Sequence, residues 1–172
     1  MLLPREHCPQ DGNHGFRMNF RIQGLRREAF AHLIDQAPDV LRRSGAERIT
    51  VANSPGYPDR ITLDDVPAGE TVLLLNHLHQ PADSPFRASH AIYVRERGGE
   101  TFDEVNVIPP ALARRLIALR AFDARDHMID ADIADGTQLP ALIGRLLANP
   151  QACYLHAHYA KWGCYAARVD RA

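Results

Sequence analysis

Short segments in which hydrophobic and polar residues alternate recur along the chain, and this pattern is typical of β-strands with one buried face. The segment "TVLLLNHLH" differs because it runs apolar on both faces, which indicates a central strand buried on two sides. A hairpin is predicted in "AFDARDHMIDADI", with its turn at Arg125 and Asp126. Further strands are predicted in "MNFRIQGL", "ERITVA", "RITL" and "SHAIYVRE", and a last hairpin over residues 154–169.

Hydrophobic residues at helical spacing mark three other segments. Residues 27–36 place Phe30, Leu33 and Ile34 on one face. Residues 109–120 open with two prolines and carry leucines at 112, 116 and 119. The clearest helix lies in residues 137–150, where Thr137 is the expected N-cap. Its apolar stripe consists of Leu139, Leu142, Ile143, Leu146 and Leu147.

These elements predict one α+β domain over residues 18–172. It should contain a largely antiparallel sheet of seven or eight strands and about three helices. Residues 1–17 carry neither a strand nor a helical period, so we expect a flexible N-terminal extension there.

Composition and charge exclude several classes of partner. The chain has 172 residues, a formal net charge of −1 and a pI near 6.7, so a nucleic-acid partner is not expected. No run of eighteen apolar residues occurs, and the N-terminus reaches Pro4 and Arg5 before a signal region could develop. We therefore expect a cytoplasmic protein without a membrane partner. Three cysteines at irregular spacing favour reduced thiols.

The last hairpin concentrates reactive side chains, because "YLHAHYAKWGCYAARV" holds two histidines, the only lysine and a cysteine. Strand alternation places His156 and His158 on one face, while Leu155, Ala157 and Tyr159 take the other. If "KWG" is a three-residue turn, His158 lies opposite Ala166 and His156 opposite Arg168. Cys164, Ala166 and Arg168 would then share the histidine face, and Tyr165 would join the apolar one.

A second pair of histidines lies upstream. In "NHLHQ", His77 and His79 share one face, and His90 begins the next predicted strand after a proline-rich connection. Several of these imidazoles converge if the last hairpin lies beside residues 71–79. We therefore predict any functional site at the rim formed by residues 77–90 and 156–168.

The stretches "LLLNHLHQPADSPFRASHAIYVRE" and "YLHAHYAKWGCYAARVDRA" resemble the signature segments of a bacterial family known only as a domain of unknown function, the twelve-hundred-and-third of that series. The resemblance covers roughly residues 18–172 and implies a compact cytosolic protein. It implies no activity or cofactor. The shared positions are His79, Gln80, Pro81, residues 87–91, His156, His158, Gly163 and Cys164. The chain departs from the family pattern at His77, where an aromatic residue is more usual, and at Tyr159, where an amide is.

Four interpretations remain open. The preferred one is a metal-free pocket for a small anion bearing a phosphate or carboxylate group, since guanidinium forks suit both. Its predicted binding residues are Arg87, Arg168, His79, His90, His156 and Lys161. The second is a zinc or iron site in a hydrolase-like enzyme, where three imidazoles leave one coordination position open. Its predicted ligands are His156 and His158, completed by His79 or His90.

The third interpretation is thiol catalysis, with Cys164 as the nucleophile and His158 or His156 as its base. The fourth is that no site exists and the histidines form a hydrogen-bonded polar patch of the sheet. The oligomeric state and the ligand itself are not determined by the sequence.

Overall fold

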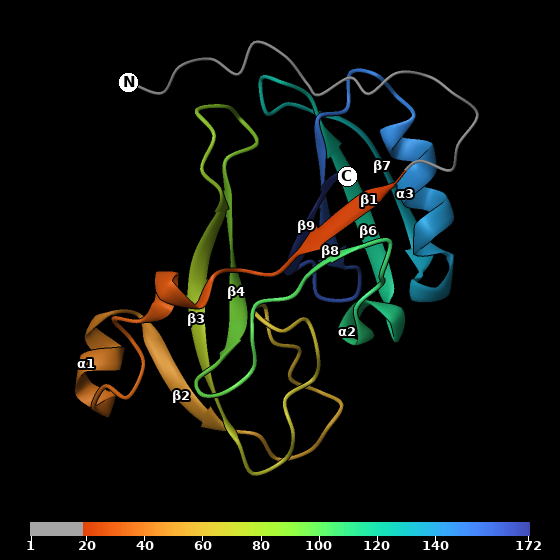
Figure 1. Ribbon diagram of the computed structural model, residues 1–172. Coiled ribbons are helices and arrows are strands. Elements are labelled where there is room, and N and C mark those ends of the chain that lie inside the picture. Colours follow the sequence, from red (N-terminus) through yellow and green to blue (C-terminus); the bar gives the residue numbers. More distant parts are fainter. Residues whose placement is uncertain (1–18) are drawn as a thin grey trace.

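Two antiparallel sheets organise the chain in the computed structural model, which describes residues 19–172 (Figure 1). The larger sheet has the order β5-β1-β9-β8-β6-β7. Its strands are β1 (Phe20–Gln23), β5 (Asp103–Val105), β6 (Leu116–Phe122), β7 (Met128–Asp135), β8 (Tyr154–Tyr159) and β9 (Tyr165–Arg171). The smaller sheet has the order β2-β3-β4 and consists of β2 (Ala46–Thr50), β3 (Thr71–Gln80) and β4 (Ala88–Arg95).

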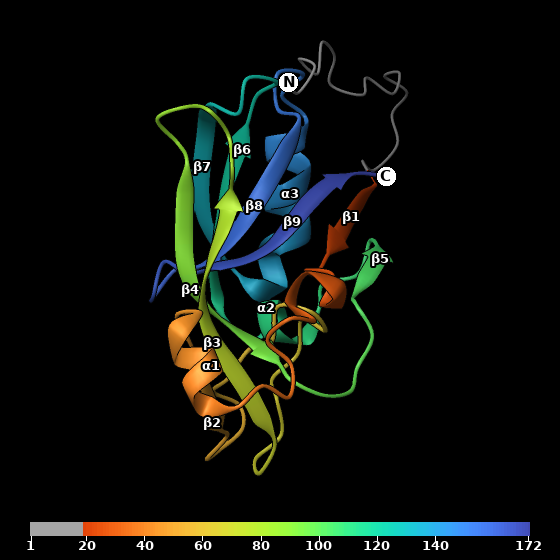
Figure 2. The same cartoon turned by 90° about the vertical axis from the view of Figure 1, so that its left-hand side faces the viewer.

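Helix α3 (Leu139–Leu147) covers one face of the larger sheet, over β6, β7 and β8 (Figures 1 and 2). Its predicted stripe is confirmed, because all five residues are buried in the main hydrophobic core. Facing residues such as Leu119 and Leu155 complete that core. The predicted cap is wrong: the residue preceding the helix is Gln138, which makes no side-chain capping bond, and Thr137 lies in a 3-10 segment (Gly136–Gln138).

A second core supports the smaller sheet. Phe30 and Leu33 pack there with Leu41 of α1 (Pro38–Arg43) and Ile92 of β4. The predicted helix over residues 27–36 is only a short 3-10 segment (Arg27–Phe30) followed by turns, although two of its three apolar residues are buried as expected. Short helices form here because Pro38 can begin a new helix but cannot continue an old one.

The β3–β4 hairpin is long enough to extend from the smaller sheet across the free face of the larger one (Figure 2). At its end the Gln80 side-chain amide donates to the Tyr154 hydroxyl at 2.7 Å, and that hydroxyl donates to Asp126 Oδ1 at 2.6 Å. This chain of hydrogen bonds holds β3 against β8. The segment ending at Gln80 therefore lies beside the C-terminal hairpin, as the site prediction required.

The α+β class and the predominance of antiparallel strands are confirmed, with three α-helices in the described residues. The strands of residues 19–172 number nine and form two sheets, instead of seven or eight in one. Residues 109–120 are not one helix: α2 (Pro110–Ala113) ends early and β6 follows. Residues 60–63 form turns instead of a strand.

The predicted N-terminal extension, residues 1–17, lies outside the described residues. Among the helices that the structure describes, none has the length and apolar character needed to span a bilayer.

Candidate functional site

Four histidines meet where the β3–β4 hairpin crosses the larger sheet. The His79 ring from β3 lies 4.8 Å from His90 of β4, 5.5 Å from His156 and 5.2 Å from His158, measured between centroids. His156 and His158 of β8 are separated by 6.2 Å. The predicted convergence of both histidine pairs at this rim is therefore observed for four of the five residues. His77 pairs with His90 in the β3–β4 ladder, but its ring packs against Phe30, 5.7 Å between centroids.

The register between β8 and β9 differs from the predicted one. His156 pairs with Arg168 as expected, but His158 pairs with Tyr165, because the register shifts after Ala157 and Ala167. Ala166 is the extra residue of this β-bulge. The turn has four residues, 160–163, instead of the predicted three. The Tyr159 backbone N–H donates to the Cys164 carbonyl at its base, and Gly163 lies in the left-handed region at φ 75°.

The bulge changes which side chain accompanies the histidines. Tyr165 lies on the histidine face, stacked on the His79 ring at 4.7 Å and meeting His156 edge-on at 5.1 Å. The prediction that Tyr165 joins the apolar face is wrong. The placement of Cys164 with the histidines is also wrong, since Cys164 precedes Tyr165 and alternation directs it to the other side.

Hydrogen bonds fix where these imidazoles carry their protons. The Gly163 carbonyl can only accept, so His158 Nδ1 must donate the 2.9 Å bond between them. The neutral ring then has its lone pair on Nε2. His79 Nε2 lies 2.7 Å from His90 Nδ1. When His79 donates this bond, its Nδ1 carries the free lone pair.

Three ring nitrogens in this cluster are buried without any hydrogen-bond partner among the described residues: His79 Nδ1, His156 Nδ1 and His158 Nε2. Buried side-chain nitrogens are normally satisfied, so three unsatisfied ones in one place need an explanation. A polar patch of mutually satisfied histidines does not describe this arrangement. Converging lone pairs instead form a set of potential metal ligands.

The cluster is also held in its neutral form. Burial lowers the pKa of His156 to about 2, that of His158 to about 3 and that of His79 to about 4, with neighbouring imidazoles and Arg120 adding to the effect. Burial also lowers the pKa of His90. Neutral imidazoles attract anions only weakly but have the lone pairs that a metal ion requires.

The spacing of the ligand atoms suits one ion. One ring nitrogen from each of His79, His156 and His158 can be chosen so that all three lie within 4.8 Å of one another. Nitrogens bound to one tetrahedral ion at 2.0–2.1 Å are roughly 3.4 Å apart. The rings would therefore need to close by about 1 Å or somewhat more around the ion.

The predicted anion-binding residues do not assemble around this cluster. Arg168 forms a two-pronged ion pair with Asp170 and stacks over Tyr154 at 4.0 Å. Arg87 is exposed and donates to the Pro81 carbonyl at 2.7 Å. Lys161 lies on the exposed turn after β8. Of the predicted set, His79, His90 and His156 lie together, and Arg168 lies opposite His156 but is engaged by Asp170.

The predicted thiol nucleophile is not paired with a base. Cys164 is a free thiol, and its Sγ lies 3.8 Å from the Trp162 carbonyl. His158 directs its hydrogen bond to the backbone instead. Cys153 is disulfide-bonded, so the expectation of reduced cysteines is wrong for that residue. Disulfides are more typical of oxidising compartments, and the cytoplasmic location stays a prediction.

One residue of this face was not predicted. Arg120 of β6 pairs directly with His156 of β8, which places both side chains on the same face. Arg120 is partly buried and makes no hydrogen bond or ion pair within residues 19–172. The leucine spacing of residues 109–120 predicts a helix at this position. The alternation in "LIALRAF" was the available signal, since Ile117, Leu119 and Ala121 are buried at every second position of that strand.

Comparison with known proteins gives one finding. A family model described as "Protein of unknown function (DUF1203)" matches residues 56–171, a range that contains all four clustered histidines. The predicted family resemblance is therefore confirmed over that range. No curated protein and no solved structure matches the chain.

Proposed function

The chain belongs to the DUF1203 family of proteins of unknown function, and we propose that it is a metalloprotein whose ligands are His79, His156 and His158. The observation that carries this proposal is the convergence of three imidazoles that each keep a buried, unpartnered ring nitrogen. A single divalent ion would satisfy all three atoms at once. Zinc and iron(II) are the best candidates, because imidazole suits both ions.

His90 would support the ion without binding it. Its Nδ1 contacts His79 Nε2 at 2.7 Å, so accepting a hydrogen bond there would orient the His79 ring toward the ion. The Gly163 carbonyl does the same for His158. Metal-binding histidines usually have such a partner on the second nitrogen, and losing it costs about 10–100-fold in metal affinity.

Three protein ligands leave a coordination position for water or a substrate atom. An ion in such a site lowers the pKa of bound water to about 7, which makes hydroxide available for hydrolysis. Arg120 adds a positive charge on the same face, and no acidic residue of the described range 19–172 forms an ion pair with it. We therefore propose a hydrolase-like reaction on a small anionic substrate, which retains the predicted preference for anions but assigns their binding to the ion and Arg120.

Metal titration of the stripped protein tests the proposal. The protein is purified without a histidine tag, treated with chelator, and titrated with zinc or iron(II) in equilibrium dialysis. One equivalent should bind, His158→Gln should abolish that binding, and His90→Gln should weaken it about 10–100-fold.

His77→Gln is the matched control, because His77 packs against Phe30 outside the cluster and its loss should leave zinc affinity unchanged. Binding of less than a tenth of an equivalent would overturn the proposal. Equal affinities for His77→Gln and His158→Gln would do so as well.

A further inference from the structure

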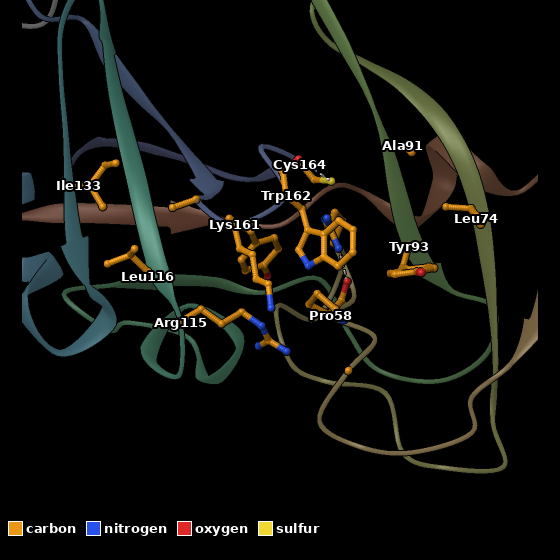
Figure 3. Close-up of a pocket in the computed structure, with 14 residues that line it drawn as sticks. Pro58, Leu74, Ala91, Tyr93, Arg115, Leu116, Ile133, Lys161, Trp162 and Cys164 are labelled. Carbon is orange, nitrogen blue, oxygen red and sulfur yellow. Dashed lines mark hydrogen bonds between the residues drawn. The ribbon is translucent and has the colours of Figure 1, made fainter.

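A cavity of about 930 Å³ opens beside the β8–β9 turn, and none of the four clustered histidines lines it. Figure 3 places it between the β6–β7 strands, which contribute Leu116 and Ile133, and the β3–β4 hairpin, which contributes Leu74 and Tyr93. Trp162 stands at its mouth and is 79% exposed. Its volume lies in the range of small-molecule sites, which are commonly lined by apolar and aromatic side chains.

The charged residues of this cavity all have one sign. Arg60, Arg115 and Lys161 line it, and no aspartate or glutamate does. Arg115 is neutralised by a two-pronged ion pair with Asp65. Lys161 has no hydrogen bond or ion pair within the described part of the chain, and Figure 3 shows its side chain directed to the same space as that of Arg115.

Arg60 is the most unusual of the three because it is only 2% exposed. Its guanidinium donates to the carbonyls of Tyr165, at 2.8 Å, and Pro58, and lies 4.9 Å from the centre of the Tyr159 ring. No carboxylate forms an ion pair with it in residues 19–172. Burial lowers the pKa of Arg60, and the negative charge of the buried Asp59 raises that pKa without forming an ion pair with the guanidinium. A buried guanidinium without an ion-pair partner is costly, so this position favours an anion in the adjoining cavity.

Tyr159 provides an independent sign of a missing partner. It lines the same cavity, its side chain is 4% exposed, and its hydroxyl is buried without a hydrogen-bond partner among the described residues. Buried tyrosine hydroxyls usually find one. An anionic group beside Arg60 would accept the hydrogen of this hydroxyl.

We propose that the cavity binds a small amphipathic anion, with an apolar body and a carboxylate or phosphate head. The body packs on Leu74, Tyr93, Leu116 and Trp162, and the head meets Arg60, Lys161 and the Tyr159 hydroxyl. The site does not depend on the metal, because its lining contains none of the three proposed metal ligands. The charged lining residues within residues 19–172 are all basic, which favours an anionic over a cationic head group.

Calorimetric titration in the presence of a chelator tests this site separately from the metal site. The probes are octanoate and octyl phosphate, with acetate as a head without a body and octylammonium as a body with the opposite charge. We expect one equivalent of octanoate or octyl phosphate to bind at least tenfold more tightly than acetate or octylammonium.

Lys161→Met removes the charge from an exposed turn while keeping an apolar stem, and should weaken binding of the anion about tenfold. Arg26→Met is its control, since Arg26 is also exposed but does not line the cavity. Arg60→Met is less suitable, because the buried guanidinium also holds two backbone carbonyls.

The absence of binding by both anions would overturn the proposal, as would octylammonium binding as tightly as octanoate. Equal effects of Lys161→Met and Arg26→Met would also overturn it. Each of these results leaves the histidine site unaffected, because chelator is present throughout.

Discussion

Lowering the pH of the metal-free protein should destabilise it steeply between pH 6.5 and pH 5. His156 and His158 are 3% and 0% exposed, and burial lowers their pKa values to about 2 and about 3. Below pH 6.5 the unfolded chain therefore binds a proton at each histidine while the folded protein does not. Proton uptake by the unfolded chain alone lowers the free energy of unfolding, and this loss grows as the pH falls from 6.5 toward the folded pKa values.

The size of the loss follows from the number of protons. One proton changes the free energy of unfolding by about 1.4 kcal/mol per pH unit, so two histidines give a limiting slope of about 2.7 kcal/mol per unit. Integrated from pH 6.5 to 5.0, the loss is about 3 kcal/mol, a large part of the usual 5–15 kcal/mol. His79, whose folded pKa is about 4, adds close to a third proton over this window, and His77 and His90, whose pKa values burial also lowers, add to the loss.

Urea unfolding followed by circular dichroism at several pH values measures this slope. Glu96 does not interfere in this window: the hydrogen bond from Arg48 lowers its pKa to about 2, and its contribution is lost only below the ordinary value of 4.5. His156→Gln should reduce the slope by the contribution of about one proton. The control is His32→Gln, at an exposed position, which should leave the slope unchanged. A stability that is constant from pH 6.5 to 5 would refute the reasoning, because it would mean that the buried imidazoles protonate in the folded state.

Two further predictions concern stability at neutral pH. Ile143→Ala, in the buried stripe of α3, should lower the free energy of unfolding by roughly 2–5 kcal/mol in urea titrations, and a loss below about 1 kcal/mol would contradict its place in the core. Gly136→Ala should be strongly destabilising, because its added Cβ would lie 2.2 Å from the Leu112 carbonyl oxygen. In Gly144→Ala the added Cβ has no atom within 4 Å, so the free energy of unfolding should rise by about 0.5–1 kcal/mol. The melting temperatures of the two variants should therefore shift in opposite directions.

Local patterns predicted the elements whose burial repeats with a regular period. The stripe from Leu139 to Leu147 can be satisfied only by a helix, and the apolar run of residues 71–75 fits a strand buried on both faces. Alternation in "YLHAHY" likewise placed His156 and His158 on one face. Their proximity to His79 requires residues 71–79 to lie beside the last hairpin, and the structure brings the two together from separate sheets, not as neighbouring strands.

The misassigned segments are those where local patterns allow two answers. Leu112, Leu116 and Leu119 fit helical spacing, yet residues 116–122 form a strand because they pair with both β7 and β8. The β8 partner lies far along the chain, outside any short window, and within the window the alternation in "LIALRAF" competes with the helical spacing of the leucines. That error removed Arg120 from the predicted site.

The bulge at Ala166 was equally invisible. Ala166 and Ala167 are identical in size and polarity, so nothing in the sequence indicates which of them is the unpaired residue. Tyr165 and Cys164 have the opposite faces to those predicted because the turn has four residues instead of three, which shifts the pairing by one residue; the bulge then restores the predicted register at Arg168. His156, on the far side of the bulge from the turn, kept its predicted partner Arg168.

X-ray absorption at the metal edge of the zinc-loaded protein tests the central claim most directly. We predict a shell of three imidazole nitrogens at about 2.0–2.1 Å from the ion, with one further light-atom ligand. In His156→Gln protein loaded in the same way, the imidazole contribution should fall to two or disappear with the ion. A spectrum of oxygen ligands alone, or one that His156→Gln leaves unchanged, would contradict the assignment of His79, His156 and His158 as the ligands.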